Sequence, residues 1–218
     1  MLADFETNIF VKYYYMNRRE SIPTIGRLYL LSSILLAVLV FTTSLDPYSI
    51  SYTFKQTIFE LDLWRPITAV LYLSRIGILL PFHLGFAYIA FLKAGTKIYP
   101  NQDKANLLWI CILSVIFLTI FSSFSGIYFF GNSLIMVLLM MWAVQNTTDS
   151  MLIFKYNLQS IYFPLIYTAI MVLLGSSFKN YIAGFLIGLF LGVVKNSTFI
   201  NQHGDRLPTP AFIKNYYH

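Results

Sequence analysis

The feature that most constrains this chain is a series of long apolar runs with few charged side chains. Of its 218 residues, 57% are hydrophobic and only 11% are charged, against roughly 25% charged residues in a soluble domain. A soluble protein of this size needs a polar surface, because its surface is large relative to its volume. We therefore expect an integral membrane protein and exclude soluble enzymes, nucleic-acid binders and disordered scaffolds.

The apolar runs predict an all-α fold with six membrane-spanning helices. At ~20 residues per span, the apolar content allows about six. The predicted spans are residues 25–44, 79–94, 107–124, 131–145, 161–174 and 181–194.

The segments between these runs complete the predicted organisation. Residues 45–65 form a loop that is too apolar for free solvent and is expected to lie in the membrane interface. Residues 66–78 lead into the second span, and residues 146–160 form a polar loop. The predicted domains are an N-terminal cytosolic or interfacial segment (1–24), a membrane domain (25–196) and a cytosolic tail (197–218).

The basic residues predict the orientation of the chain in the membrane. With the N-terminus in the cytosol, eleven Lys and Arg side chains lie on the cytosolic side of six spans, and four lie opposite: Lys55, Arg65, Arg75 and Lys179. Cytosolic loops of membrane proteins carry an excess of these residues, so both termini are expected in the cytosol. The net charge of +6 is then a property of the loops, not a sign of nucleic-acid binding. Two glycosylation sequons, at Asn146 and Asn196, fall on the cytosolic side and are predicted to be unused.

Three predicted spans have short apolar cores, at 134–144, 161–174 and 181–194. A helix shorter than the hydrocarbon layer is accommodated by thinning the bilayer, by recruiting flanking residues or by hiding behind neighbours. Three such helices predict a bundle that deforms the membrane around it. The alternative is that the helices are longer than their apolar cores.

The last span carries glycines at every fourth position: Gly184, Gly188 and Gly192. Small residues at this spacing lie on one helix face and let two helix backbones approach closely in lipid. The spacing predicts tight packing of this span against a neighbour. The alternative is the general enrichment of glycine in membrane helices.

Two further motifs hold residues that could carry chemistry. Trp64 and Arg65 stand just before Pro66, where Trp suits the headgroup level and Arg can donate to backbone carbonyls or phosphate. Gly131 and Ser133 open the fourth span, and a serine there is a candidate nucleophile that needs a base within hydrogen-bond reach.

The sequence offers no evident base for this serine. Of the three histidines, His83 is in the second span, and the other two are in the tail. Ser133 is therefore expected to pack or to bond the local helix backbone, and His83 to bond a neighbouring helix. The single Cys111 excludes a cysteine metal cluster, and neither a metal site nor a cofactor is expected.

Several segments, in this order and spacing, resemble the derlins, the catalytically inactive rhomboid-like proteins of endoplasmic-reticulum-associated degradation. They are 21–29 (SIPTIGRLY), 46–48 (DPY), 63–68 (LWRPIT), 128–134 (YFFGNSL), 161–164 (IYFP), Gly184 with Gly188, and 207–213 (LPTPAFI). The chain has Leu134 where active rhomboids carry a second glycine after the catalytic serine.

The resemblance implies a rhomboid-like bundle of six helices in the endoplasmic reticulum membrane. It implies a non-catalytic role in the retrotranslocation of misfolded proteins, aided by local bilayer thinning. The implied partners are misfolded clients, a ubiquitin-ligase membrane complex, the lipid bilayer and further copies or relatives of the chain. No ATPase-binding motif is evident in the tail, so direct ATPase binding is not expected.

Three alternative functions stay open from the sequence. The chain could be an active intramembrane serine protease that uses Ser133 with His83 as an unusual base. It could be a non-catalytic membrane adaptor or channel subunit. A related organelle import system could also use the same fold.

Overall fold

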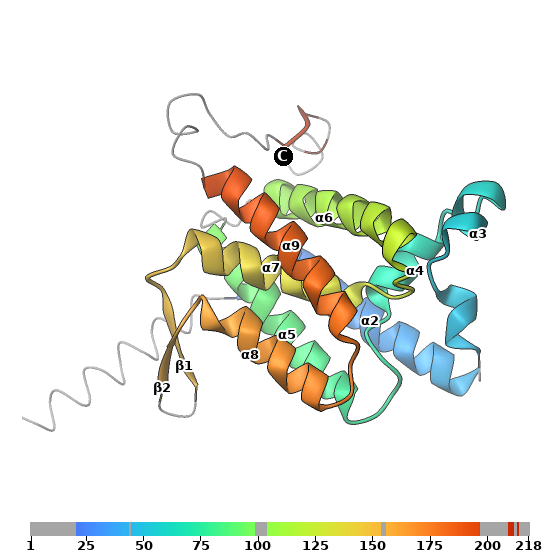
Figure 1. Ribbon diagram of the computed structural model, residues 1–218, viewed down its shortest axis with the longest axis horizontal. Helices are drawn as coiled ribbons and strands as arrows, with labels where there is room; N and C mark the ends of the chain where they lie inside the picture. The colour runs from blue at the N-terminus through green and yellow to red at the C-terminus, as the bar shows by residue number, and fades with distance from the viewer. Residues whose placement is uncertain are drawn as a thin grey trace, which may run out of the picture.

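The computed structural model describes residues 21–43, 45–98, 104–153, 156–196, 209–211 and 213, and it is mostly helical (Figure 1). Its elements are α2 (Thr24–Thr42), η1 (Pro47–Ile50), α3 (Phe54–Phe59), α4 (Arg65–Leu71), α5 (Leu79–Lys93), the π-helical turn η2 (Ala94–Ile98), α6 (Lys104–Ser125), α7 (Gly131–Gln145), β1 (Ser150–Ile153), β2 (Tyr156–Gln159), α8 (Tyr162–Leu173) and α9 (Phe178–Asn196).

Four helices of the described residues are long and apolar enough to cross a membrane. They are Thr24–Thr42, Leu79–Thr96, Ala105–Ser125 and Phe178–Lys195. Helices α7 and α8 are also apolar, but they have only 15 and 12 residues. The chain is therefore a multi-pass membrane protein, and six apolar helices occupy the six ranges that the sequence predicts as spans.

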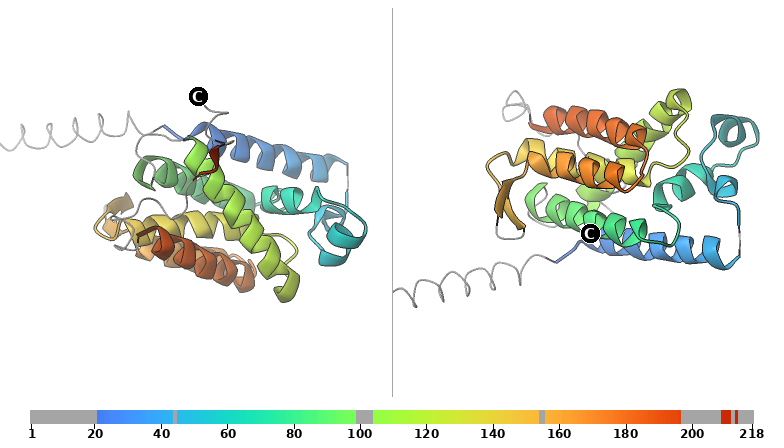
Figure 2. Two further views of the ribbon diagram at one scale, coloured as in Figure 1. Left: turned by 90° about the horizontal axis from the view of Figure 1, so that it is seen from above. Right: turned by 60° about the horizontal axis from the view of Figure 1, so that its bottom comes forward.

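Helix α7 lies at the centre of the bundle. Every residue of α7 from Gly131 to Ala143 is buried, and α7 contacts α5, α6, α8 and α9 (Figures 1 and 2). Helix α2 packs on the outside against α5. A helix that is apolar on all sides belongs in such a buried position. The hydrophobic core therefore surrounds α7, and the other long helices present apolar side chains outward.

The glycines of α9 permit its close contact with α7. A Cβ atom built on Gly184 would lie 2.4 Å from the carbonyl oxygen of Ser133, and one on Gly188 would lie 2.8 Å from that of Val137. At Gly192 the nearest atom would be 3.2 Å away. The backbones are thus closest at the start of α7 and diverge slightly toward its end. This is the tight packing that the glycine spacing predicts.

Local sequence signals set the short length of α8. Pro164 lies in its first turn, where a missing N–H group costs nothing. At the other end, Gly175 has φ +95°, a conformation that glycine adopts readily. The N–H groups of Gly175 and Ser176 donate to the carbonyls of Val172 and Met171, the bonding pattern that ends many helices. The stop is therefore encoded in the chain.

The expectation of three short spans is wrong at the last of them. Helix α9 has 19 residues and begins at Phe178, three residues before the predicted start. Lys179 and Asn180 lie before the predicted span, yet they form part of the first turn of α9. Polar side chains at a helix end can reach the interface while their backbone stays helical.

The structure also corrects the expectation of a wholly helical chain. The predicted polar loop 146–160 contains an antiparallel hairpin, β1 with β2, in which Ser150 pairs with Gln159. Ser160 closes its base, because its N–H donates to the carbonyl of Asp149 and its hydroxyl to that of Asn146. These bonds join residues ten or more positions apart, which periodicity does not reveal. A second difference concerns the predicted lead-in to the second span, residues 66–78, because its first part forms the helix α4.

The predicted terminal segments lie mostly outside the described residues. In the tail, Thr209 and Ile213 are buried, and the Thr209 hydroxyl contacts the side chain of Asn106 on α6. Cys111 is a buried free cysteine, as its apolar surroundings in the sequence suggest.

We predict that Gly188→Leu destabilises the protein, because its side chain would meet Val137 and Met140 of α7 at less than 3.0 Å. The expected loss in the free energy of unfolding is about 2 kcal/mol or more. Thermal unfolding of the purified protein in detergent measures it.

Gly85→Leu is the matched control, since a Cβ atom there meets nothing within 4 Å. Equal unfolding temperatures for the two variants would contradict the packing role of Gly188.

Candidate functional site

Arg65 ties the loop after α2 to the start of α4. Its Nη1 atom donates to the carbonyls of Ser49 at 2.9 Å and Ser51 at 3.1 Å. Its Nε atom donates to Asp62 Oδ2 at 2.7 Å, and the residue is only 7% exposed. Its guanidinium also lies 5.0 Å from the ring centroid of Trp64. Arg65 therefore acts as an internal clamp, in keeping with the backbone bonding that its position suggests.

The segment held by Arg65 exposes a large apolar surface. Trp64 is 45% exposed. The other exposed large apolar side chains of α3 and its flanks are Phe54, Ile58, Phe59, Leu61, Leu63 and Ile67. Such a surface, next to helices long enough to span a membrane, is typical of a segment that lies in the interface plane. The structure thus gives a physical basis for the predicted interfacial loop.

The motif at the start of α7 is joined to three other elements. Gly131 lies against α4, because a Cβ atom there would be 2.6 Å from the carbonyl of Val70. That carbonyl accepts a hydrogen bond from the Tyr29 hydroxyl at 2.9 Å. Asn132 donates from Nδ2 to the carbonyl of Leu73 at 3.3 Å.

Ser133 is buried and is bonded to a different helix from the one expected. Its hydroxyl donates to the carbonyl of Asn180, on α9, at 2.7 Å, whereas the sequence suggested a bond within α7. The glycines of α9 explain the difference, since they bring the α9 backbone within reach of this short side chain. Among the described residues, no basic or acidic side chain bonds to Ser133, although a nucleophilic serine needs a base within hydrogen-bond reach.

A buried polar cluster joins α5, α8 and α9 close to this point. His83 Nε2 lies 3.4 Å from the Tyr181 hydroxyl, so His83 does bond a neighbouring helix. The ring centroids of Tyr181 and Tyr167 are 5.3 Å apart, edge to face. His83 Nδ1 and the Tyr167 hydroxyl are buried, and neither has a hydrogen-bond partner among the described residues. The cluster therefore retains unused hydrogen-bonding capacity inside an apolar bundle.

An apolar pocket of about 220 Å³ lies beside this cluster. Its lining residues come from α7, α8 and α9: Met136, Leu165, Thr168, Phe178, Tyr181, Ile182 and Phe185. Tyr181 belongs to both the pocket and the cluster. The candidate site is therefore an apolar recess beside the short helix α8, with polar groups close behind it.

Sequence reasoning missed Tyr167, Tyr181 and Asn180, which the structure places at the centre of this site. Two of them are polar residues inside predicted spans, a signal that could have singled them out. No group of three metal-ligating side chains occurs in the described part of the chain.

We predict that Arg65→Ala destabilises the first loop. It leaves the carbonyls of Ser49 and Ser51 without their donor and Asp62 without its cation. The expected loss in the free energy of unfolding is about 1.5–3 kcal/mol. Lys55→Ala, at an exposed lysine of α3, is the control and should change it by less than about 0.5 kcal/mol. An Arg65→Ala protein as stable as the control in detergent would contradict the clamp.

A second prediction compares the two tyrosines of the polar cluster. Tyr181→Phe removes the partner of His83 and should cost about 1 kcal/mol of unfolding free energy. Tyr167→Phe removes a hydroxyl that has no partner and should cost nothing. Thermal unfolding of both variants in detergent measures these effects. Equal losses of stability would show that the bond between His83 and Tyr181 does not stabilise the fold.

A comparison with protein families shows that the model of the Der1-like family matches residues 22–211. The match covers α2 through α9, and thus the clamp, the α7–α9 contact and the apolar pocket.

Proposed function

The chain belongs to the Der1-like family, and from this premise we propose that it is a derlin-type component of endoplasmic-reticulum-associated degradation. In this role it aids the passage of misfolded proteins from the lumen to the cytosol, as a multi-pass protein of the endoplasmic reticulum membrane. It works by thinning the bilayer locally, without catalysis. Family membership and the membrane-spanning helices support this role.

The proposed topology has six spans with both termini in the cytosol. Arg27 lies near the start of α2, Lys93 at the end of α5 and Lys195 at the end of α9. These ends share the cytosolic side if the six apolar helices alternate in direction. Arg75, before α5, and Lys179, at the start of α9, then face the lumen. The excess of basic residues at the cytosolic ends supports this orientation.

The observation that carries the thinning proposal is the length and exposure of α8. Its 12 residues extend about 18 Å, against a hydrocarbon layer of ~30 Å. Its side chains reach the lipid, since Leu165 is 55% and Leu173 is 86% exposed. Helix α7 is also short, but it is enclosed by its neighbours, so lipid does not contact it. The mismatch therefore falls on the α8 face of the bundle.

The candidate site lies on this same face and suits a passing chain. Peptide groups are costly in hydrocarbon unless they find hydrogen-bond partners. The pocket between α8 and α9 would receive apolar side chains, and the unpaired groups of His83 and Tyr167 lie close behind it. A thin bilayer with polar groups near its centre lowers the barrier to a client chain.

Absence of catalysis is part of the proposal. The Ser133 hydroxyl donates to the carbonyl of Asn180, and no basic side chain among the described residues bonds to it. The proposed partners are misfolded proteins and a ubiquitin-ligase complex of the same membrane, with no cofactor.

A translation-shutoff chase of a misfolded lumenal glycoprotein tests this function. Cells would carry the wild-type protein, no copy, or Ile182→Trp, which fills the pocket beside α8. We expect the reporter to persist several-fold longer without the protein and with Ile182→Trp. Leu189→Trp is the control: it is similarly exposed on α9, two turns away, but lies outside the pocket, and it should restore degradation.

Ser133→Ala separates this function from proteolysis. If the protein is present at its normal level, the variant should degrade the reporter at the wild-type rate. Loss of degradation together with Ser133-dependent labelling by a fluorophosphonate probe would instead establish a protease. An unchanged reporter half-life in cells without the protein would contradict a role in this route.

A further inference from the structure

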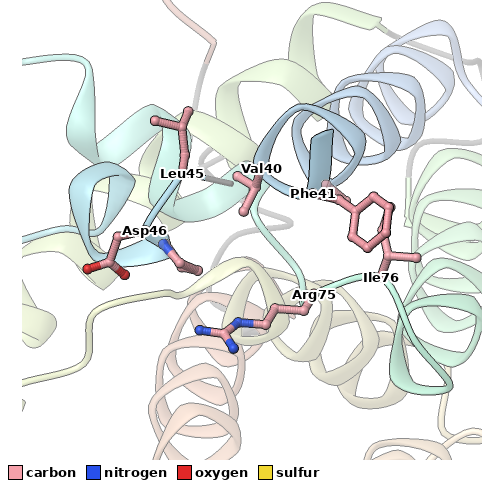
Figure 3. A pocket seen from close by; sticks show the side chains of 8 residues that line it. Val40, Phe41, Leu45, Asp46, Arg75 and Ile76 are labelled. Carbon is pink, nitrogen blue, oxygen red and sulfur yellow. The ribbon is translucent and has the colours of Figure 1, made fainter. Parts of the chain in front are cut away.

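A second, larger pocket lies between the end of α2 and the segment that leads into α5. It has a volume of about 460 Å³ and shares no residue with the pocket beside α8 (Figure 3). Its lining residues are Ala37, Val40, Phe41, Leu45, Asp46, Pro47, Arg75 and Ile76. The volume is within the roughly 300–1,000 Å³ of small-molecule sites.

One part of this pocket is apolar. Ala37 and Val40 are buried at 2% and 7% exposure. Phe41 and Ile76 are 68% and 42% exposed, and Figure 3 shows their side chains lying together. This surface can receive a hydrocarbon chain, and it removes apolar area from water when it does.

The other part of the pocket holds two opposite charges that are not paired. Arg75 and Asp46 are both exposed, and neither forms an ion pair among the described residues. Asp46 Oδ1 accepts a hydrogen bond from the N–H of Tyr48 at 3.1 Å, which fixes its position. In Figure 3, the Arg75 side chain extends away from the apolar pair and toward the side of the pocket where Asp46 lies.

Tyr72 does not neutralise Arg75. This residue lies between α4 and α5, and burial raises the pKa of its phenol despite the nearby charge of Arg75. The phenol therefore supplies no negative charge to pair with Arg75. A ligand that brings a negative group to Arg75 gains a charge-assisted hydrogen bond.

The position of the pocket relative to the membrane surface indicates which ligands can reach it. Helix α2 ends at Thr42 and α5 begins at Leu79, so the pocket lies where two spanning helices meet the same membrane surface. Phosphate and amine groups of lipids occupy this level, with acyl chains directly beneath. Arginine is well suited to phosphate, because its planar guanidinium can donate two parallel hydrogen bonds.

We propose that this pocket binds one zwitterionic phospholipid. Arg75 binds its phosphate, Asp46 attracts its amine, and the first part of an acyl chain lies against Phe41 and Ile76. The carboxylate of Asp46 disfavours lipids with a net negative headgroup, because it repels their extra charge. The bound lipid joins the end of α2 to the start of α5, and the site does not depend on the proposed role in degradation.

Native mass spectrometry of the full-length protein, stripped of lipid in detergent, tests the proposal. The probes are phosphatidylcholine, phosphatidylglycerol, glycerophosphocholine (the headgroup without acyl chains) and inorganic phosphate. We expect the wild-type protein to retain one phosphatidylcholine in preference to the other three. Arg75→Gln should weaken this retention about tenfold or more, as the loss of a hydrogen bond to a charged group would.

Three further variants sharpen the test. Lys179→Gln removes an exposed cation elsewhere and should bind lipid like the wild type. Arg75→Lys keeps a cation and should retain most of the binding. Asp46→Asn should shift the preference toward phosphatidylglycerol, because it removes the repulsion while an amide oxygen can still accept from Tyr48.

Four results would overturn the proposal. The first is equal lipid retention by Arg75→Gln and Lys179→Gln, and the second is a preference of the wild-type protein for phosphatidylglycerol. The third is binding of inorganic phosphate or glycerophosphocholine as tight as that of phosphatidylcholine. The fourth is an unchanged lipid preference in Asp46→Asn. Unfolding temperatures in lipid-free detergent show that each variant is folded, and Arg75→Met replaces Arg75→Gln if that variant is not.

Discussion

Helices α7 and α9 are packed backbone against backbone, and the positions of the other elements depend on this contact. Gly184 and Gly188 leave no side chain between the two helices, so the carbonyls of Ser133 and Val137 lie where a Cβ atom would clash. In lipid, where apolar side chains gain little by leaving their surroundings, such close packing supplies much of the association energy. It also brings the Asn180 carbonyl to the Ser133 hydroxyl, which places this serine in a structural bond.

The burial of α7 also affects which helices can contact the bilayer. Because its neighbours surround it, α7 can be short without any cost in lipid. Helix α8, of 12 residues, is less sheltered: one face is buried against the bundle, and the other exposes Leu165 and Leu173. Mismatch energies are small per ångström, but in the proposed thinning mechanism they act on one face. That face carries the apolar recess and the polar cluster of His83 and Tyr181 behind it.

The part of the chain between α2 and α5 is organised around two arginines with different surroundings. Arg65 is buried and saturated by Asp62 and two backbone carbonyls, so it stabilises the loop itself. Arg75 is exposed and without an anionic partner among the described residues, so its charge is available to a ligand. Arg65 thus holds this segment from within, whereas the side chain of Arg75 is accessible to the headgroup of the proposed lipid.

The sequence by itself determined that the chain is a membrane protein, where its six apolar helices lie, and that the glycines of α9 form a packing face. It also contained the stop of α8, because Pro164 and Gly175 act within one turn of the helix ends. These properties depend on composition and on neighbours within a few positions. Only the tertiary structure decided that Ser133 bonds Asn180, that Tyr181 meets His83, and that α8, unlike α7, exposes apolar side chains on the outside of the bundle. Each of these joins residues on different helices, and periodicity gives the face of a helix but not its neighbour.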